Sequence, residues 1–253
     1  MSAASASSRW RRSSRCRRAI PPSAIQRRNR LSAEKAKPAP PVMVIGLGRF
    51  GSAVARSLTR VGHEVLGVDQ DMAVVQSLSE ELTHVVQADT TNPIALKKLG
   101  AGDMEHAVVG IGSDIEASVL TVVALADAGC RDIWAKAVNA NHGRILERVG
   151  ATHVVFPEAE MGERVAHMVT GKMIDFIQFD DDFAIVKTRV PRFMAGKTLL
   201  QTDVRKAHGV TIVGVKRPRE PFIHAIPDTV VYLSDLLIVS GATDAVERFA
   251  ALT

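Results

Sequence analysis

Three glycines and an aspartate have the types and spacing needed to hold a phosphorylated nucleotide. Gly46, Gly48 and Gly51 follow a short apolar run with the spacing G-x-G-x-x-G. In such a turn the first glycine permits a tight bend, the second lets the backbone approach a phosphate, and the third lets the next helix pack closely. Free N–H groups at the start of that helix attract the anion. Asp69 ends a second apolar run, where its carboxylate can accept hydrogen bonds from ribose hydroxyls. The alternative is a tight strand–helix turn without a ligand.

The elements that position these residues alternate between strands and helices. We expect strands at 42–45, 65–68, 84–88, 107–111, 133–137 and 153–156, with helices between them. This pattern predicts an α/β fold with a Rossmann-like doubly wound parallel sheet of strand order 3-2-1-4-5-6. The polar loops at 46–51, 69–71, 89–91 and 112–114 then meet at the switch point between the first and fourth strands.

The rest of the chain divides into three further parts. Residues 1–40 read as a disordered basic tail before the nucleotide-binding domain at 41–157. Residues 158–177 carry apolar side chains at helical spacing, which indicates a long helix. It either packs on its own domain or serves as a crossover and dimerisation helix, and its length favours the second reading. Residues 178–253 mix short strands, prolines and short helices, as is typical of a small α+β domain.

Charge is distributed unevenly along the chain. The first 40 residues hold nine Arg and two Lys against the single acid Glu34. Their net charge is therefore +10, whereas that of the whole chain is +5. The other residues therefore carry −5, and no nucleic-acid footprint follows. Besides a solvated tail, the Arg- and Ser-rich segment fits a transit peptide, a start codon placed too far upstream, or a basic arm on anionic lipid.

Two general classes of protein are disfavoured by composition. No stretch of the sequence approaches 18 uninterrupted apolar residues, so no membrane-spanning helix is expected. Cys16 and Cys130 are too few for a disulfide framework, which suits a reducing compartment.

Several motifs follow one another in the order of one known family. They are GLGRFG, the acid at the second strand end, IGSDIEAS, KA-x-N and GA-x-x-x-x-x-PE-x-x-MG, followed by the small terminal domain. Over residues 42–253 the chain resembles a regulatory subunit of a Ktr/Trk potassium uptake system, near the KtrA branch. Such subunits combine an RCK domain (TrkA-N) with an RCK-C domain (TrkA-C).

The resemblance implies a regulator and not an enzyme. It implies a cytoplasmic subunit, peripheral at the inner face of the membrane, which forms homodimers that assemble into a ring, usually of eight chains. The ring docks on a separate membrane subunit that conducts potassium. ATP and ADP, or NAD(H) in some branches, bind the RCK site and change the shape of the ring.

The resemblance also assigns site residues. It places the nucleotide on Gly46, Gly48, Arg49, Phe50, Gly51, Asp69, Asp71, Asp89, Thr90, Ser113, Lys136 and Glu158. Asp71, Asp89 and Thr90 would lie near the adenine. Arg49 would reach the terminal phosphates in a neighbouring subunit, which suits a forked cation beside a phosphate loop. Lys136 would lie near the phosphates and Glu158 near a divalent or monovalent cation. As alternatives, Arg49 is a solvated loop residue and Glu158 an acid favoured at a helix N-terminus.

A second ligand is implied for the RCK-C domain. Residues 199–205 resemble the family's cyclic di-AMP site, in which Arg205 would contact phosphate. The sequence then departs from the branch, because Lys206-Ala207-His208 replaces its usual Ala-Lys-aromatic order. Surface charges on a short helix are the alternative reading.

Other functions remain in competition with this one. An NAD(P)-dependent oxidoreductase would need a proton donor and a substrate clamp, and the single tyrosine, Tyr232, offers no Tyr-x-x-x-Lys motif. An NADH-binding redox sensor would still be an RCK protein. A DNA-binding repressor using the basic tail would need a helix-turn-helix, and none is apparent.

Overall fold

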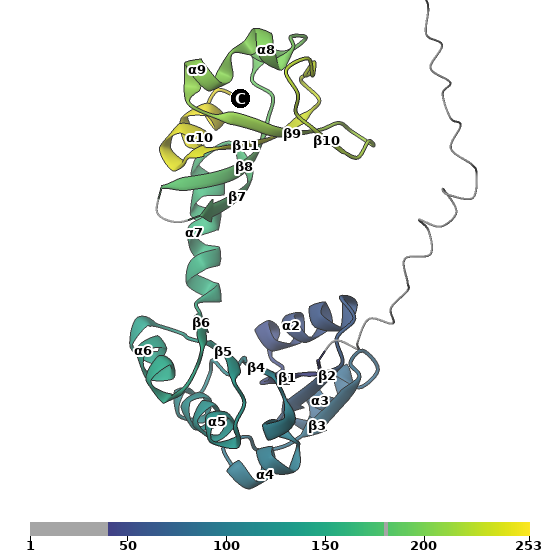
Figure 1. Cartoon of the computed structure of the whole chain (residues 1–253), viewed down its shortest axis with the longest axis vertical. Coiled ribbons are helices and arrows are strands. Elements are labelled where there is room, and N and C mark those ends of the chain that lie inside the picture. Colours follow the sequence, from purple (N-terminus) through teal and green to yellow (C-terminus); the bar gives the residue numbers. More distant parts are fainter. Residues whose placement is uncertain (1–39, 180–181) are drawn as a thin grey trace, which may run out of the picture. The chain divides into compact units, whose positions relative to one another are not determined.

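The computed structural model describes residues 40–179 and 182–253. The predicted tail at 1–40 therefore lies, apart from its last residue, outside the described residues. The first part of the described chain alternates strands and helices (Figure 1). Its elements are β1 (Val42–Ile45), α2 (Arg49–Arg60), β2 (Val65–Asp69), α3 (Met72–Leu78), β3 (His84–Gln87), α4 (Pro93–Lys98), the 3-10 helix η2 (Ala101–Asp103), β4 (His106–Val109), α5 (Ile115–Ala128), β5 (Asp132–Lys136), α6 (Ala140–Val149) and β6 (His153–Val155).

These six strands form one parallel sheet of order β3-β2-β1-β4-β5-β6. The predicted doubly wound order is thereby confirmed. Strand β1 lies at the centre, where Val44 pairs in register with Gly67 of β2 and Val108 of β4. All four residues of β1 are buried, as expected of a strand covered on both faces. The strands before β4 are added on one side of β1, and those from β4 onward on the other side. The loops that follow β1 and β4 therefore diverge and leave a crevice.

Apolar side chains fix the helices against this sheet. Leu125 of α5 and Leu146 of α6 are fully buried in one cluster with Ile133 of β5. Burying a side chain of this size stabilises the fold by about 1.5–3 kcal/mol. Asp114 and Asn139 begin α5 and α6, and each carboxylate or amide oxygen accepts a backbone N–H of the first turn. Gly129 and Gly150 end these helices in the left-handed conformation that glycine favours.

The helix predicted at 158–177 is shorter than expected. Helix α7 (Pro157–Thr170) ends at Gly171, and strand β7 (Met173–Phe179) begins two residues later. The apolar residues that seemed to continue the helix lie instead in a strand, with Met173 and Phe176 buried and Ile174 and Ile177 exposed. A shift of register between Met173 and Asp175 lets two buried residues three positions apart share one face. The antiparallel sheet therefore starts before residue 178.

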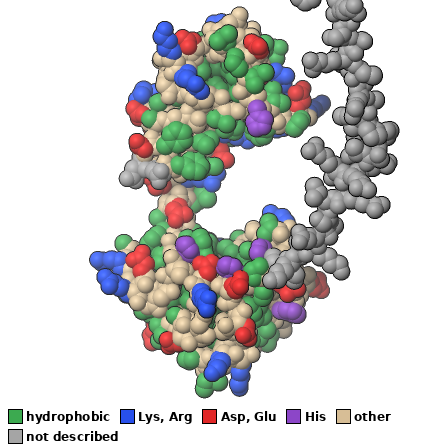
Figure 2. Space-filling model, viewed as in Figure 1, with side chains coloured by type: hydrophobic (Ala, Val, Ile, Leu, Met, Phe, Trp, Pro, Cys, Tyr) green, Lys and Arg blue, Asp and Glu red, His purple; other side chains and the backbone are tan. Residues whose placement is uncertain are grey.

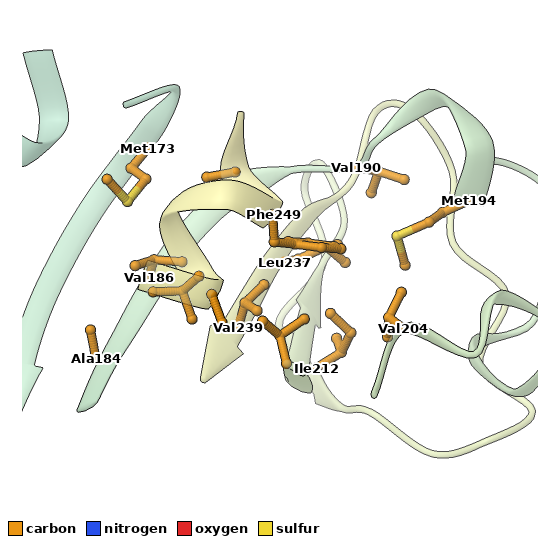
Figure 3. Close-up of a cluster of buried hydrophobic side chains, with 14 of the residues drawn as sticks. Met173, Ala184, Val186, Val190, Met194, Val204, Ile212, Leu237, Val239 and Phe249 are labelled. Carbon is orange, nitrogen blue, oxygen red and sulfur yellow. The ribbon is translucent and has the colours of Figure 1, made fainter. Parts of the chain in front are cut away.

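The C-terminal part is an antiparallel sheet of order β10-β9-β11-β8-β7 with helices. After β7 it contains β8 (Phe183–Arg189), the 3-10 helix η3 (Arg192–Met194), α8 (Leu199–Thr202), α9 (Val204–His208), β9 (Thr211–Lys216), β10 (Phe222–His224), β11 (Leu236–Ala242) and α10 (Thr243–Ala250). Phe249 of α10 is fully buried among Leu237, Val190 and Met194 (Figure 3). The predicted small α+β fold is confirmed.

Candidate functional site: a cavity at the carboxyl ends of the parallel strands

The glycine turn between β1 and α2 has two different kinds of glycine. Gly46 has a φ of +79°, and Gly51 lies so close to it that a Cβ on Gly51 would be 2.0 Å from the Gly46 carbonyl oxygen. Both residues are required by the turn itself. Gly48, the N-cap of α2, has a φ of −61°, and a Cβ there would meet no protein atom within 4 Å. The fold therefore does not explain Gly48, whereas a ligand close to the backbone would.

Asp69 holds the turn together at the end of β2. Its Oδ2 accepts a hydrogen bond from the Leu47 N–H at 2.7 Å, and its Oδ1 accepts one from the Asp71 N–H at 2.9 Å. Each oxygen keeps a second lone pair for another donor. The carboxylate is thus fixed beside the glycine turn and can still accept ribose hydroxyls.

The predicted loops enclose one cavity of about 590 Å³. This volume is within the range of sites for small organic ligands. Its lining includes ten of the twelve predicted residues: Gly46, Gly48, Arg49, Phe50, Asp69, Asp89, Thr90, Ser113, Lys136 and Glu158. Apolar side chains in the lining include Val68, Ala88 and Ile111.

The two remaining residues do not line the cavity. Gly51 is buried beneath the turn, where it permits the close approach of α2. Asp71 caps α3 by accepting a hydrogen bond from the Ala73 N–H at 2.8 Å. Its place near an adenine stays a prediction. An Asp before a helix serves both purposes in sequence, and here the cap is the observed one.

Cationic groups gather at one end of the cavity. Helix α2 begins there with no side-chain cap, so its first N–H groups are free, and Arg49 is exposed in its first turn. Lys136, at the end of β5, lies 5.9 Å from the centre of the Phe50 ring. Its Nζ donates to Oε1 of Glu158, in the first turn of α7, at 2.5 Å. The Lys136 ammonium lowers the pKa of the Glu158 carboxyl, and Arg49 adds to this shift.

Carboxylates also line the cavity. Asp89 follows β3 and lies in the lining with Asp69. The hydroxyl and N–H of Thr91 donate to Asp89, which lowers the pKa of its carboxyl. Thr90 is buried, and its hydroxyl forms a hydrogen bond with that of Thr121 in α5 at 2.9 Å. Thr90 therefore anchors this loop to α5, and Asp89 is the member whose carboxylate remains exposed to a ligand.

The loop 112–114 lines the cavity as predicted, but two of its residues were not predicted as site residues. Gly112 and Asp114 line the cavity on either side of the predicted Ser113. Asp114 also caps α5, accepting from the Ala117 N–H at 2.9 Å. A cap before a long helix was a readable signal for Asp114, whereas nothing near Gly112 in the sequence indicated its importance.

Residues 199–205 lie beside a smaller pocket of about 260 Å³ in the C-terminal part. Arg205 and Asp203 line it together with Leu200, Ile226 and Pro227. The residues of the predicted second site are thus brought together, on a surface that includes the exposed side chains of Leu200 and Ile226.

Two kinds of feature are absent from the described part of the chain. Within residues 40–179 and 182–253, no three His, Cys, Asp or Glu side chains are grouped so that they could hold a metal ion. In the same residues no helix combines the length and apolarity needed to cross a membrane. On the face drawn in Figure 2, Lys and Arg side chains are scattered among acids and form no continuous basic stripe.

Known families and relatives match most of the described chain. The model of the TrkA-N domain matches residues 42–157, and that of the TrkA-C domain matches residues 190–253. The chain is 36% identical over 207 residues to Ktr system potassium uptake protein C of Bacillus subtilis (strain 168), covering 81% of this chain and 94% of that protein. It is 33% identical to Ktr system potassium uptake protein A of the same organism, with 81% and 93% covered.

Solved structures share the fold. The GsuK RCK domain superposes with a TM-score of 0.59 at 20% identity, covering 91% of this chain and 51% of that one. The GsuK channel bound to NAD gives a TM-score of 0.57 at 20% identity, with 90% and 42% covered. The chain thus spans about half of those structures or less, and at this identity the likeness shows the fold alone.

Proposed function

The chain belongs to the Ktr potassium uptake proteins that join a TrkA-N to a TrkA-C domain, and from this premise we propose that it is a nucleotide-sensing regulatory subunit of a potassium uptake system. It binds an adenine nucleotide in the cavity of the TrkA-N domain. Its conformation then controls a separate membrane subunit that conducts K⁺. It works from the cytoplasm, peripheral at the inner face of the membrane, and catalyses no reaction.

The combination of charges in the cavity is the observation that carries this proposal. Its lining joins the start of α2, Arg49 and Lys136 to the carboxylates of Asp69 and Asp89. A nucleotide offers the complementary groups, because its phosphates are anionic and its ribose hydroxyls are donors. The open space beside Gly48 lies at the start of α2, where the backbone would approach a phosphate.

We favour ATP and ADP over NAD(H) because of Arg49. Adenine, ribose and two phosphates are common to ATP and ADP, so a switch must read the third phosphate. An exposed, always-charged fork beside the phosphate loop can reach it, most usefully across a dimer interface. NAD(H) is the alternative ligand and would identify a redox sensor instead; the GsuK channel, which shares the fold, has been solved bound to NAD.

A cation completes this proposal at Glu158. The Glu158 side chain is 67% exposed. Its carboxylate accepts a hydrogen bond from Lys136, and both residues line the cavity. Since no protein cluster could hold a metal ion within the described ranges, phosphate oxygens would supply the remaining ligands.

The proposal for assembly of several copies of the chain rests on exposed apolar residues of α7. Met161, Val165 and Val169 are all exposed and lie at intervals of four residues, which places them on one side of the helix. We propose that this stripe forms a homodimer and that dimers build a larger ring, an octamer as in the family. Replacing Val165 and Val169 with Glu should give a smaller particle by light scattering, whereas an unchanged mass would contradict the assignment.

Thermal unfolding with ATP, ADP, NADH and cyclic di-AMP tests the function. A ligand at a hundred times its dissociation constant raises the free energy of unfolding by about 2.7 kcal/mol. ATP and ADP should both stabilise the protein, and Arg49→Ala should reduce the preference for ATP while leaving the ADP shift nearly intact. Stabilisation by NADH alone would replace the nucleotide switch with a redox sensor. Stabilisation by cyclic di-AMP that Arg205→Ala removes would place the second ligand at residues 199–205.

A further inference from the structure

We propose that Gly112 is a positioning residue of the cavity: because it has no side chain, Lys136 can lie across it and present its ammonium at the phosphate end. The inference rests on the proposed function, since it concerns how the same cavity recognises the charge of its ligand. It concerns the loop after β4, which lies outside the glycine turn.

The backbone at position 112 does not itself call for glycine. Gly112 is not among the glycines with a positive φ, in contrast with Gly46. A Cβ at position 112 would lie 3.2 Å from both Cε and Nζ of Lys136 and 3.5 Å from Cγ1 of Val138. The space that glycine leaves is therefore the space that the end of the lysine side chain uses.

Lys136 is enclosed along its whole path. Its side chain is only 12% exposed although it ends in a charge. The centre of the Phe50 ring lies 5.9 Å from Nζ, a Cβ at position 112 would lie 3.2 Å from Cε and Nζ, and Glu158 accepts the hydrogen bond from Nζ. These three residues come from α2, the loop after β4 and α7, so they define one slot for the ammonium.

A methyl group at position 112 would push on the most flexible part of Lys136. The 3.2 Å approach involves the end of a side chain and no backbone atom, so the lysine can move and the fold is retained. Cε and Nζ of Lys136 must give way by a few tenths of an ångström, which disturbs the placement of the ammonium between Phe50 and Glu158. The cation that would meet phosphate is thereby displaced, while the surfaces that would meet ribose and adenine stay unchanged.

Calorimetric titration of the full chain with adenosine, ADP and ATP tests this inference. Gly112→Ala should weaken ADP or ATP by about tenfold or more, the range of a lost charge-assisted hydrogen bond, and leave adenosine unchanged. Lys136→Met should cause the same loss, and the double variant should lose nothing further. Gly162→Ala, where a Cβ meets nothing within 4 Å, is the matched control. Equal weakening of adenosine, additive losses or unchanged phosphate binding would overturn the proposal.

A readout without nucleotide separates this inference from the proposed function. The rate at which acetic anhydride modifies Lys136, followed by mass spectrometry, should rise in Gly112→Ala and stay at the parent value in Gly162→Ala. An unchanged rate overturns the role of Gly112 whatever the protein binds. If the parent binds no nucleotide but the rate rises as expected, the proposed function fails and the positioning of Lys136 by Gly112 stands.

Discussion

The two pockets of this chain are built in opposite ways. In the TrkA-N domain, loops from five parallel strands and the first turn of α7 converge on a cavity of about 590 Å³. In the C-terminal part, α8, α9 and the segment 225–227 border a pocket of about 260 Å³ on an antiparallel sheet. The first pocket is lined by two cationic side chains and four carboxylates, whereas the second has one Arg and one Asp among mainly apolar side chains.

The difference follows from strand direction. Parallel strands bring all their carboxyl ends to one edge, so residues far apart in sequence meet there and a complete site forms within one chain. Antiparallel strands distribute their loops between two edges, and the smaller pocket remains next to exposed Leu200 and Ile226. We therefore expect the larger cavity to bind its ligand within one subunit, apart from Arg49, and the smaller pocket to need a second copy of the chain.

Among the substitutions that test this comparison, Gly51→Ala should have the largest effect. Its Cβ would lie 2.0 Å from a backbone oxygen that cannot move away, so we expect a loss of about 3 kcal/mol or more in unfolding free energy. Chemical denaturation measures it. Gly48→Ala is the matched variant, because its Cβ meets no protein atom. It should keep the parent stability and lose nucleotide affinity; normal affinity in that variant would mean that no ligand approaches Gly48.

Asp69→Ala comes next. It removes the acceptor for Leu47 and Asp71 together with the predicted ribose acceptor, so ADP and ATP should weaken together by about tenfold or more. Asp71→Ala is the control outside the cavity. It removes only the cap of α3, at a cost of about 1 kcal/mol in stability. A larger loss of affinity in Asp71→Ala than in Asp69→Ala, measured by calorimetry, would show that the ribose-binding role had been assigned to the wrong acid.

The smallest effect concerns the pH dependence of Glu158. Its pKa is lowered in the folded protein by Lys136, so the stabilising contribution is present above the unfolded pKa and is lost as the pH falls through the folded pKa. Lys136→Met should raise the Glu158 pKa toward its ordinary value, which a carboxyl NMR titration can follow. Lys97→Met, on α4, should leave it unchanged. An unshifted Glu158 pKa in Lys136→Met would show that the two side chains do not pair in solution.

Much of the larger site could be predicted because its signals are local. Glycine spacing, a terminal Asp and alternating apolar runs specify the strand order and the loops that meet at the switch point. The extent of α7 could not be predicted, because Met173 and Ile177 continue a helical spacing and also suit a strand. Gly112 could not be predicted either, since its importance depends on where Lys136 of another strand passes. Thr90 was placed in the right loop, but its hydroxyl turned toward Thr121.

Hydrogen exchange of the full chain with saturating ADP tests the central claim most directly. The account predicts slower exchange at 46–51, 69–71, 89–91 and 112–114, because one ligand contacts the loops that line the larger cavity. It predicts no change at 199–205, beside the smaller pocket. Protection confined to 199–205, or an unchanged rate in the four loops of the parallel sheet, would contradict it.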